Sequence, residues 1–100
     1  MTKYLFKLYI AGQTARSQHA VANLRRMCEE TLSDQYELVI IDVLECPQLA
    51  EDERILATPT LIKEAPAPTR RVIGDLTDKQ KVMIALNIEG NSSPYQEDKQ

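Results

Sequence analysis

Large apolar side chains alternate with other residues near the start of the chain, where residues 4–11 read YLFKLYIA. Alternation with a period of two predicts a strand. Both faces of this strand carry bulk, which is typical of a strand with neighbours on both sides. One face comprises Tyr4, Phe6, Leu8 and Ile10, and the other comprises Leu5, Lys7 and Tyr9. We therefore expect a central strand that ends at Gly12.

The spacing of apolar residues then becomes helical, and residues 15–32 are predicted to form a long amphipathic helix with Thr14 as its N-cap. The apolar positions are Ala20, Val21, Leu24, Met27, Cys28 and Leu32. Residues 36–44 are predicted as a second strand. Its centre, Val39-Ile40-Ile41, is apolar on both faces, as in buried parallel strands. Strand, helix and strand together predict a right-handed βαβ unit.

Prolines divide the second half of the chain. Pro47 opens a predicted short helix, because proline suits the first helical turn. Pro59 directly precedes the predicted short strand 60–63 and is expected at the start of this third strand, since proline cannot donate to a central ladder. A cis Thr58–Pro59 bond is compatible with such a turn. The proline-rich residues 64–69 join this strand to a fourth at 70–73 as a hairpin, which Gly74-Asp75 ends.

The last predicted helix covers residues 78–88. Thr77, with Gln80 three residues later, fits a capping box, and Gly90 is a C-terminal stop signal. Residues 91–100 are expected to form a flexible polar tail beyond one domain of residues 1–90. The order βαβαββα predicts an α/β domain with a thioredoxin-like fold.

Composition and charge argue against several classes of protein. The net charge is −3 and the pI is about 5.1, whereas a general nucleic-acid binder usually has a basic face. No apolar run approaches the roughly 18 residues that a membrane span needs. The first residues lead directly into the strand pattern and do not resemble a secretory signal. We therefore expect a cytoplasmic protein without a nucleic-acid or membrane partner.

The candidate chemical residues are few. Cys28 and Cys46 are too few and too far apart for a metal knuckle or a disulfide framework, and His19 lacks companions at ligand spacing. A redox site in a thioredoxin-like fold needs a thiolate at the start of the first helix, but residues 12–17 contain no cysteine. Cys28 is predicted to lie in the core. Cys46 lies at a predicted helix start, where the pKa of a thiol can be lowered, so a redox or stress function acting through Cys46 is an alternative. No cofactor, metal or catalytic residue is predicted.

Five stretches of the chain resemble the KaiB family of circadian-clock proteins. They are Leu8-Tyr9-Ile10-Ala11-Gly12, Val39-Ile40-Ile41-Asp42-Val43-Leu44, Pro47-Gln48-Leu49-Ala50-Glu51, Ile55-Leu56-Ala57-Thr58-Pro59-Thr60-Leu61 and Arg70-Arg71-Val72-Ile73-Gly74-Asp75-Leu76. The resemblance is collinear over about residues 4–88. It implies a non-enzymatic adaptor that binds the ATPase ring of a KaiC-type protein. It also implies two folds, the thioredoxin-like one and a βαββααβ ground state that assembles into tetramers.

The resemblance implies a partner-binding site in two segments. The first comprises Pro47, Gln48, Leu49, Ala50 and Glu51, and the second comprises the basic hairpin residues Lys63, Arg70 and Arg71. Composition alone indicates that these basic residues are solvated at the strand ends. The resemblance instead favours a role in partner contact. Charge reversal at Arg70 or Lys63 is then expected to weaken ring binding and leave the fold intact. A homodimer and a homotetramer both stay open.

The fold switch implied by the resemblance involves the X-Pro turn at Pro59, the hairpin end at Gly74 and Asp75, and the last helix. Here the chain has Ala85 and Asn87 where familiar clock sequences have Gly and Asp, which favours the helix and hence the thioredoxin-like state. His19 and Ala22, and Glu37 and Val39, depart from the family at positions associated with KaiA, which weakens the expectation of KaiA binding. A KaiB-like sensory module outside a clock is a further alternative.

Overall fold

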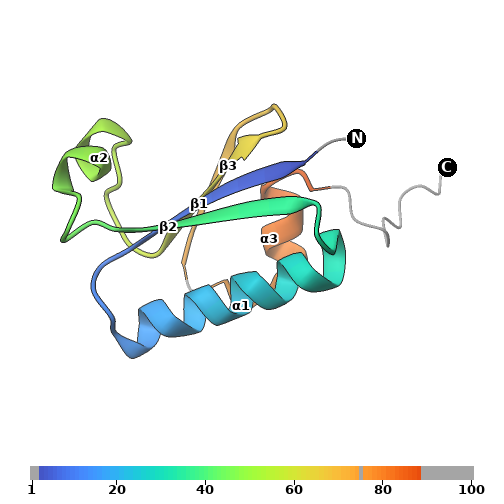
Figure 1. The fold of residues 1–100 in the computed structure, drawn as a ribbon, viewed down its shortest axis with the longest axis horizontal. Coiled ribbons are helices and arrows are strands. Elements are labelled where there is room, and N and C mark those ends of the chain that lie inside the picture. Colours follow the sequence, from blue (N-terminus) through green and yellow to red (C-terminus); the bar gives the residue numbers. More distant parts are fainter. Residues whose placement is uncertain (1–2, 75, 89–100) are drawn as a thin grey trace, which may run out of the picture.

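Four strands form one sheet in the order β2-β1-β3-β4 in the computed structural model, which describes residues 3–74 and 76–88 (Figure 1). The elements are β1 (Tyr4–Ile10), α1 (Ala15–Leu32), β2 (Tyr36–Asp42), α2 (Pro47–Asp52), β3 (Thr60–Ala65), β4 (Arg70–Ile73) and α3 (Lys79–Ala85). Strand β1 pairs parallel with β2 and antiparallel with β3, and β3 pairs antiparallel with β4. The predicted thioredoxin-like order is confirmed, and the alternative order βαββααβ is not the one that these residues form.

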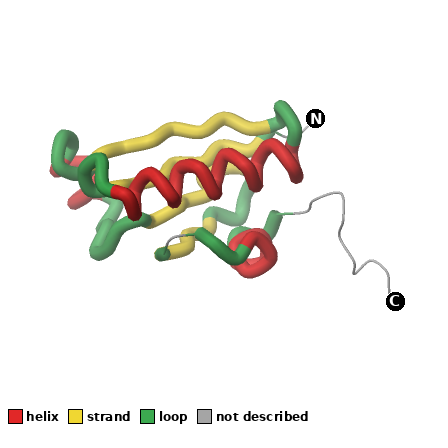
Figure 2. Tube along the Cα trace, turned by 90° about the horizontal axis from the view of Figure 1, so that it is seen from below, coloured by secondary structure: helices red, strands yellow, loops and turns green. Residues whose placement is uncertain are grey.

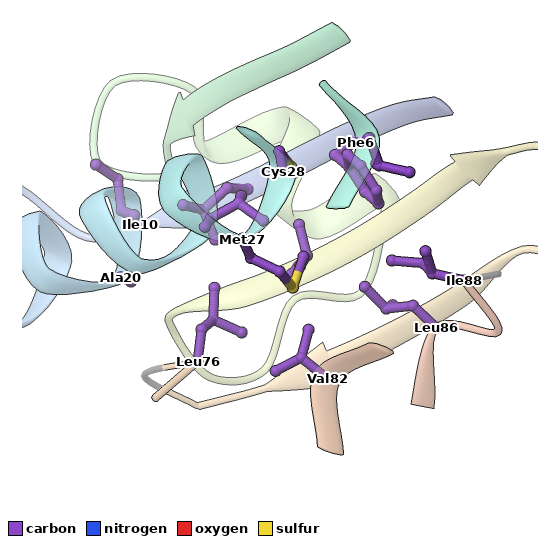
Figure 3. Packing of buried hydrophobic residues seen from close by; sticks show 13 residues of the cluster. Phe6, Ile10, Ala20, Met27, Cys28, Leu76, Val82, Leu86 and Ile88 are labelled. Carbon is purple, nitrogen blue, oxygen red and sulfur yellow. The ribbon is translucent and has the colours of Figure 1, made fainter. Parts of the chain in front are cut away.

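Helices α1 and α3 cover the same face of the sheet (Figure 1), and Figure 2 shows α1 running along the strands. Their apolar stripes meet the inward side chains of β1 and β3 in one core, part of which Figure 3 draws. Its buried members include Phe6, Leu8, Ile10, Ala20, Leu24, Met27, Cys28, Leu61, Val82 and Leu86. Lys79 on α3 also forms a 3.0 Å ion pair with Glu30 on α1. The predicted alternation of β1 and the helical spacing of residues 15–32 are thus confirmed.

The opposite face of the sheet has a smaller core. Tyr9, Ile41 and Ile62 are buried there, and partly buried residues around α2 pack against them, namely Val43, Cys46 and Ile55. Helix α2 lies beyond one end of β1 and β2 (Figure 1), so it covers only part of this face. Tyr9 therefore packs beneath the α2 region, a position that the sequence did not decide.

Strand β2 lies at an edge of the sheet, and the expectation of a strand buried on both faces is wrong for it. Its burial alternates, and Val39 is 38% exposed on the face opposite α1. Strand β3 is also two residues longer than predicted and ends at Ala65. Val39 stays in contact with solvent because α2 covers only part of the second face.

Asp78, not Thr77, caps helix α3. The Asp78 carboxylate accepts a 3.2 Å hydrogen bond from the Lys81 backbone N–H, so the N-cap lies one residue later than predicted. The helix also ends earlier than predicted, at Ala85, and Gly90 lies outside the described residues. Asn87 takes the left-handed conformation, with φ of 58°, that a glycine would take after a helix.

A Schellman motif closes α3. The Ile88 N–H donates to the Met83 carbonyl at 2.9 Å, and the Asn87 N–H donates to the Ile84 carbonyl at 3.1 Å. Ile88 is buried in the main core, which supplies the hydrophobic contact of the motif. Asn87 therefore acts outside the helix as its C′ residue, and asparagine is among the residues that tolerate this conformation.

Candidate functional site

Helix α2 presents its surface to solvent. Pro47 occupies its first turn as predicted, and none of its six residues is buried. Cys46 is the N-cap by backbone position, but its side chain makes no capping hydrogen bond. Gln48 donates a 2.9 Å hydrogen bond to Asp52 one turn later. A helix that buries none of its own side chains contributes little to the core, so its residues are available for contact with another molecule.

The C-terminal end of α2 is fixed to strand β4 by an arginine. The Arg71 guanidinium donates to the backbone carbonyls of Glu53, at 3.1 Å, and Arg54, at 3.5 Å. Arg54 itself is left-handed with φ of 56°, and the Ile55 N–H donates back to the Ala50 carbonyl. The last carbonyls of a helix have no partner inside it and carry partial negative charge, so a cation there is favourable. Arg71 thereby joins the two segments that the sequence predicted for partner contact.

The three predicted basic residues do not form one edge. Arg71 pairs with Ile62 and shares its side of the sheet, the side of α2, while Arg70 projects from the opposite side. Lys63 is 1% exposed and lies on the same side as the core residue Leu61. Lys63 is therefore not a solvated strand-end residue, and the expectation that its charge reversal would leave the fold intact is replaced by the opposite one.

Exposed apolar side chains surround the α2 region. Leu49 on α2 is 46% exposed, Leu56 after it is 92% exposed, and Ile73 at the end of β4 is 58% exposed. We call these three residues, together with Pro47, Gln48, Ala50, Glu51 and Arg71, the α2 surface. Apolar side chains beside one fixed cation are typical of a protein-docking surface.

Sequence reasoning found the helix and Arg71 but missed Leu56 and Ile73. Leu56 could have been found as a large apolar residue that fits neither strand nor helix spacing and lies just before the Pro59 turn. Ile73 could have been found from the alternation of β4, which places Ile73 on the same side of the sheet as Arg71.

The predicted switch residues lie where the end of β4 meets the start of β3. Gly74, with φ of 134°, donates its N–H to the Pro59 carbonyl at 2.9 Å. The Thr58–Pro59 bond is cis, and the Thr60 hydroxyl donates to the Ala57 carbonyl at 2.6 Å. Asp75 lies outside the described residues. Only glycine adopts the Gly74 backbone conformation without strain, so this junction depends on it.

The two cysteines are free and differ in exposure. Cys28 is fully buried in the main core, and burial raises the pKa of its thiol to about 12. Because only the thiolate is nucleophilic, Cys28 is inert at neutral pH. Cys46 is half-buried at the start of α2. Within residues 3–74 and 76–88, no three His, Cys, Asp or Glu side chains gather to hold a metal ion, and no helix there could cross a membrane.

The different environments of the two thiols predict selective labelling. At pH 8, a thiol reagent such as dithionitrobenzoate should modify one cysteine in the folded protein and two in denaturant. Cys46→Ser should abolish the folded-state signal, because the Cys28 thiol stays protonated and covered. Above pH 9 the unfolded thiol ionises while the folded one does not, so stability falls as the pH rises from about 9 toward 12. Labelling of Cys28 in the folded Cys46→Ser variant at pH 8 would contradict this assignment.

These features define a class: a thioredoxin-like domain whose first helix begins without cysteine and whose second helix forms an exposed apolar surface with a fixed arginine. The KaiB domain model matches residues 7–88, and the chain belongs to the KaiB family. It is 52% identical over 88 residues to circadian clock protein KaiB3 of Synechocystis sp., covering 88% of this chain and 86% of that protein. It is also 52% identical over 85 residues to circadian clock oscillator protein KaiB of Prochlorococcus marinus, covering 85% and 79%.

Solved structures agree with this assignment. The N-terminal domain of SasA from Synechococcus elongatus is similar with a TM-score of 0.72 and 27% identity, over 89% of this chain and 88% of that one. Chloroplastic thioredoxin z is similar with a TM-score of 0.68 and 24% identity, over 85% and 76%. The second likeness concerns the fold alone. The family match relates this chain to circadian clock proteins.

Proposed function

We propose that this chain is a non-catalytic, KaiB-like adaptor that binds a KaiC-type ATPase ring through the α2 surface, in circadian or clock-like regulation. The observation that carries this proposal is the pair of hydrogen bonds from Arg71 to the carbonyls of Glu53 and Arg54. These bonds hold β4 and α2 as one unit. A cytoplasmic location is part of the proposal.

The α2 surface has the composition that protein interfaces favour. Binding energy in such interfaces is concentrated in a few large apolar or arginine side chains that become fully desolvated. Leu49, Leu56 and Ile73 are exposed in the free chain and supply that apolar area. Because Arg71 is already held by two carbonyls, less side-chain entropy is lost when a partner covers it. KaiA is not included among the proposed partners, since Glu37 and Val39 depart from the family at positions that the resemblance associates with KaiA.

Size-exclusion chromatography with and without a KaiC-type ring tests the proposal. The wild-type chain is expected to co-elute with the ring, and Cys46→Ser is expected to co-elute equally well. A thiol-reduction assay on the same samples addresses the redox alternative. Turnover that disappears in Cys46→Ser, or failure of the wild-type chain to join any ring offered, would overturn the adaptor proposal.

We further propose that a fold switch, if this chain retains one, is biased toward the thioredoxin-like state. The last segment is helical in that state, and Ala85 is its final, exposed helical residue. Asn87 adds to the bias, because an uncharged residue beside the C-terminal carbonyls avoids the unfavourable interaction that an aspartate would have.

Ala85→Gly is expected to lower the stability of this state by roughly 0.5–1 kcal/mol, because glycine loses more backbone entropy in a helix. Backbone NMR of both proteins should show residues 79–85 helical, with faster amide exchange in the variant. A wild-type spectrum in which these residues are extended would refute the bias toward the thioredoxin-like state. Ala22→Gly, at an exposed position within α1, is the matched control, because it removes the same methyl group from a helix outside the proposed switch.

A further inference from the structure

The α2 surface lies at the end of a long acidic stretch. Residues 29–53 contain nine acidic residues and neither lysine nor arginine. Four of the nine lie on α2 or directly beside it, namely Glu45, Glu51, Asp52 and Glu53. Of the five that lie away from α2, four accept a hydrogen bond or form an ion pair inside the protein: Glu29, Glu30, Asp34 and Asp42. The acids at α2 need a separate explanation.

None of the four carboxylates at α2 forms an ion pair with another residue of the described ranges. Arg71 donates to two backbone carbonyls at the end of α2 rather than to a carboxylate, so its charge is directed at the helix end. Glu45, Glu51 and Asp52 are exposed, and Glu53 is half-buried. The exposed apolar side chains of the α2 surface are thus accompanied by carboxylates that no cation of the fold neutralises.

Helix stability does not account for the position of three of these acids. Glu51 and Asp52 are the last two residues of α2, and Glu53 is its C-cap. The last turn of the helix contains no basic residue. Because the carbonyls at the end of a helix carry partial negative charge, carboxylates beside them are unfavourable. Such residues weaken the helix that carries them, so their place is better explained by an external cationic group than by folding.

The Tyr9 phenol, which is buried beneath the α2 region, responds to the sign of the local electric field. Burial raises the pKa of this phenol, and the carboxylates of Glu53 and Glu64 raise it further. Arg71 lowers the same pKa, but by less than either carboxylate raises it. The field near the end of α2 is therefore negative even with Arg71 in place, which agrees with the charge of the surrounding residues.

We infer that the protein surface which covers the α2 surface is cationic, with lysine or arginine side chains around an apolar patch. Leu49 and Leu56 pack against the apolar patch, and Glu45 and Glu51, towards the two ends of α2, face the cations. Opposite charges around an apolar centre speed association and reject partners of like charge. The inference rests on the proposed function where the partner is a KaiC-type ring, and it adds the chemistry of the ring surface that is contacted.

Two synthetic peptides of equal length, in which leucines are interleaved with either lysine or glutamate, test the inference without a ring. In amide NMR spectra at low salt, the lysine peptide is expected to shift the signals of residues 44–56 and the glutamate peptide to leave them unchanged. Glu51→Lys should weaken binding of the lysine peptide at least about fivefold. This variant is not expected to unfold α2, because a cation suits the end of a helix.

Asp34→Lys is the matched control, because Asp34 is exposed, precedes the opposite end of β2 and gives the same change in net charge. Its affinity for the lysine peptide should stay within about twofold of wild type. Equal binding of both peptides at residues 44–56, or equal effects of the two substitutions, would overturn the inference.

Stopped-flow association with a KaiC-type ring separates this inference from the adaptor proposal. The association rate constant is expected to fall at least about fivefold as NaCl rises from about 20 to about 200 mM, and Glu51→Lys should lower it at least about tenfold at the lower salt. A rate that rises with salt, or faster association of Glu51→Lys, would overturn the inference and leave ring binding standing. Binding of the lysine peptide without binding to any ring would overturn the adaptor proposal and support the inference.

Discussion

Lys63→Glu is expected to lower the free energy of unfolding by about 3–5 kcal/mol. Lys63 is 1% exposed and lies on β3 on the side of Leu61, in the layer covered by α1 and α3. A glutamate there would bury a carboxylate in surroundings that accommodate an ammonium group, and a buried charge without a partner is costly. Since a domain of this size has about 5–15 kcal/mol of total stability, the loss is a large fraction. Urea unfolding followed by circular dichroism measures it.

Arg70→Glu is the matched control, because Arg70 pairs with Lys63 in the β3–β4 ladder but is exposed. The same charge reversal there should change the stability by no more than about 0.5 kcal/mol. Equal urea midpoints for the two variants would mean that Lys63 is not buried. The comparison separates an effect of burial from one of net charge, since both variants change the net charge by the same amount.

Leu49→Asp is expected to weaken binding to a KaiC-type ring at least thirtyfold, which corresponds to about 2 kcal/mol. Leu49 lies on α2 and is 46% exposed, so its replacement leaves the fold intact. In the complex, a carboxylate at the centre of an apolar contact would be desolvated without a partner, which is the condition under which an interface substitution is most damaging. Affinity would be measured by titrating the immobilised ring with each chain.

Ile84→Asp provides the control for this experiment. Ile84 is 76% exposed on α3, on the side of the sheet away from the α2 surface. Its replacement introduces the same charge and removes a comparable apolar side chain. Ring affinity is expected to stay within twofold of wild type. A comparable loss in both variants would assign the effect to net charge or stability rather than to the α2 surface.

Much of the fold follows from local patterns. Alternation places Phe6 and Leu8 on one face of a central strand, and the spacing of Leu24 and Cys28 places them on the buried side of a helix; both are confirmed. The start of the last helix does not follow from local pattern, because Thr77 and Asp78 are both good N-caps and the sequence alone does not rank neighbouring candidates. In the structure, Asp78 is the N-cap.

The errors in the candidate site have a different physical origin. Lysine is rarely buried, and this preference outweighed the alternation that already placed Lys63 on the side of Leu61. The bonds from Arg71 to Glu53 and Arg54 join residues 17 and 18 positions apart, and they depend on how the chain returns along β4. No local pattern encodes such a contact. The edge position of β2 likewise depends on the order of strands in the sheet.

Hydrogen exchange of the free chain and of its complex with a KaiC-type ring tests the central claim most directly, because amides covered by a partner are protected. The account predicts added protection at the Pro47–Asp52 helix and at the Arg70–Ile73 strand, which Arg71 holds together. Little change is predicted at the solvent-facing residues of α1. A complex that protects α1 and leaves these two elements unchanged would contradict the account.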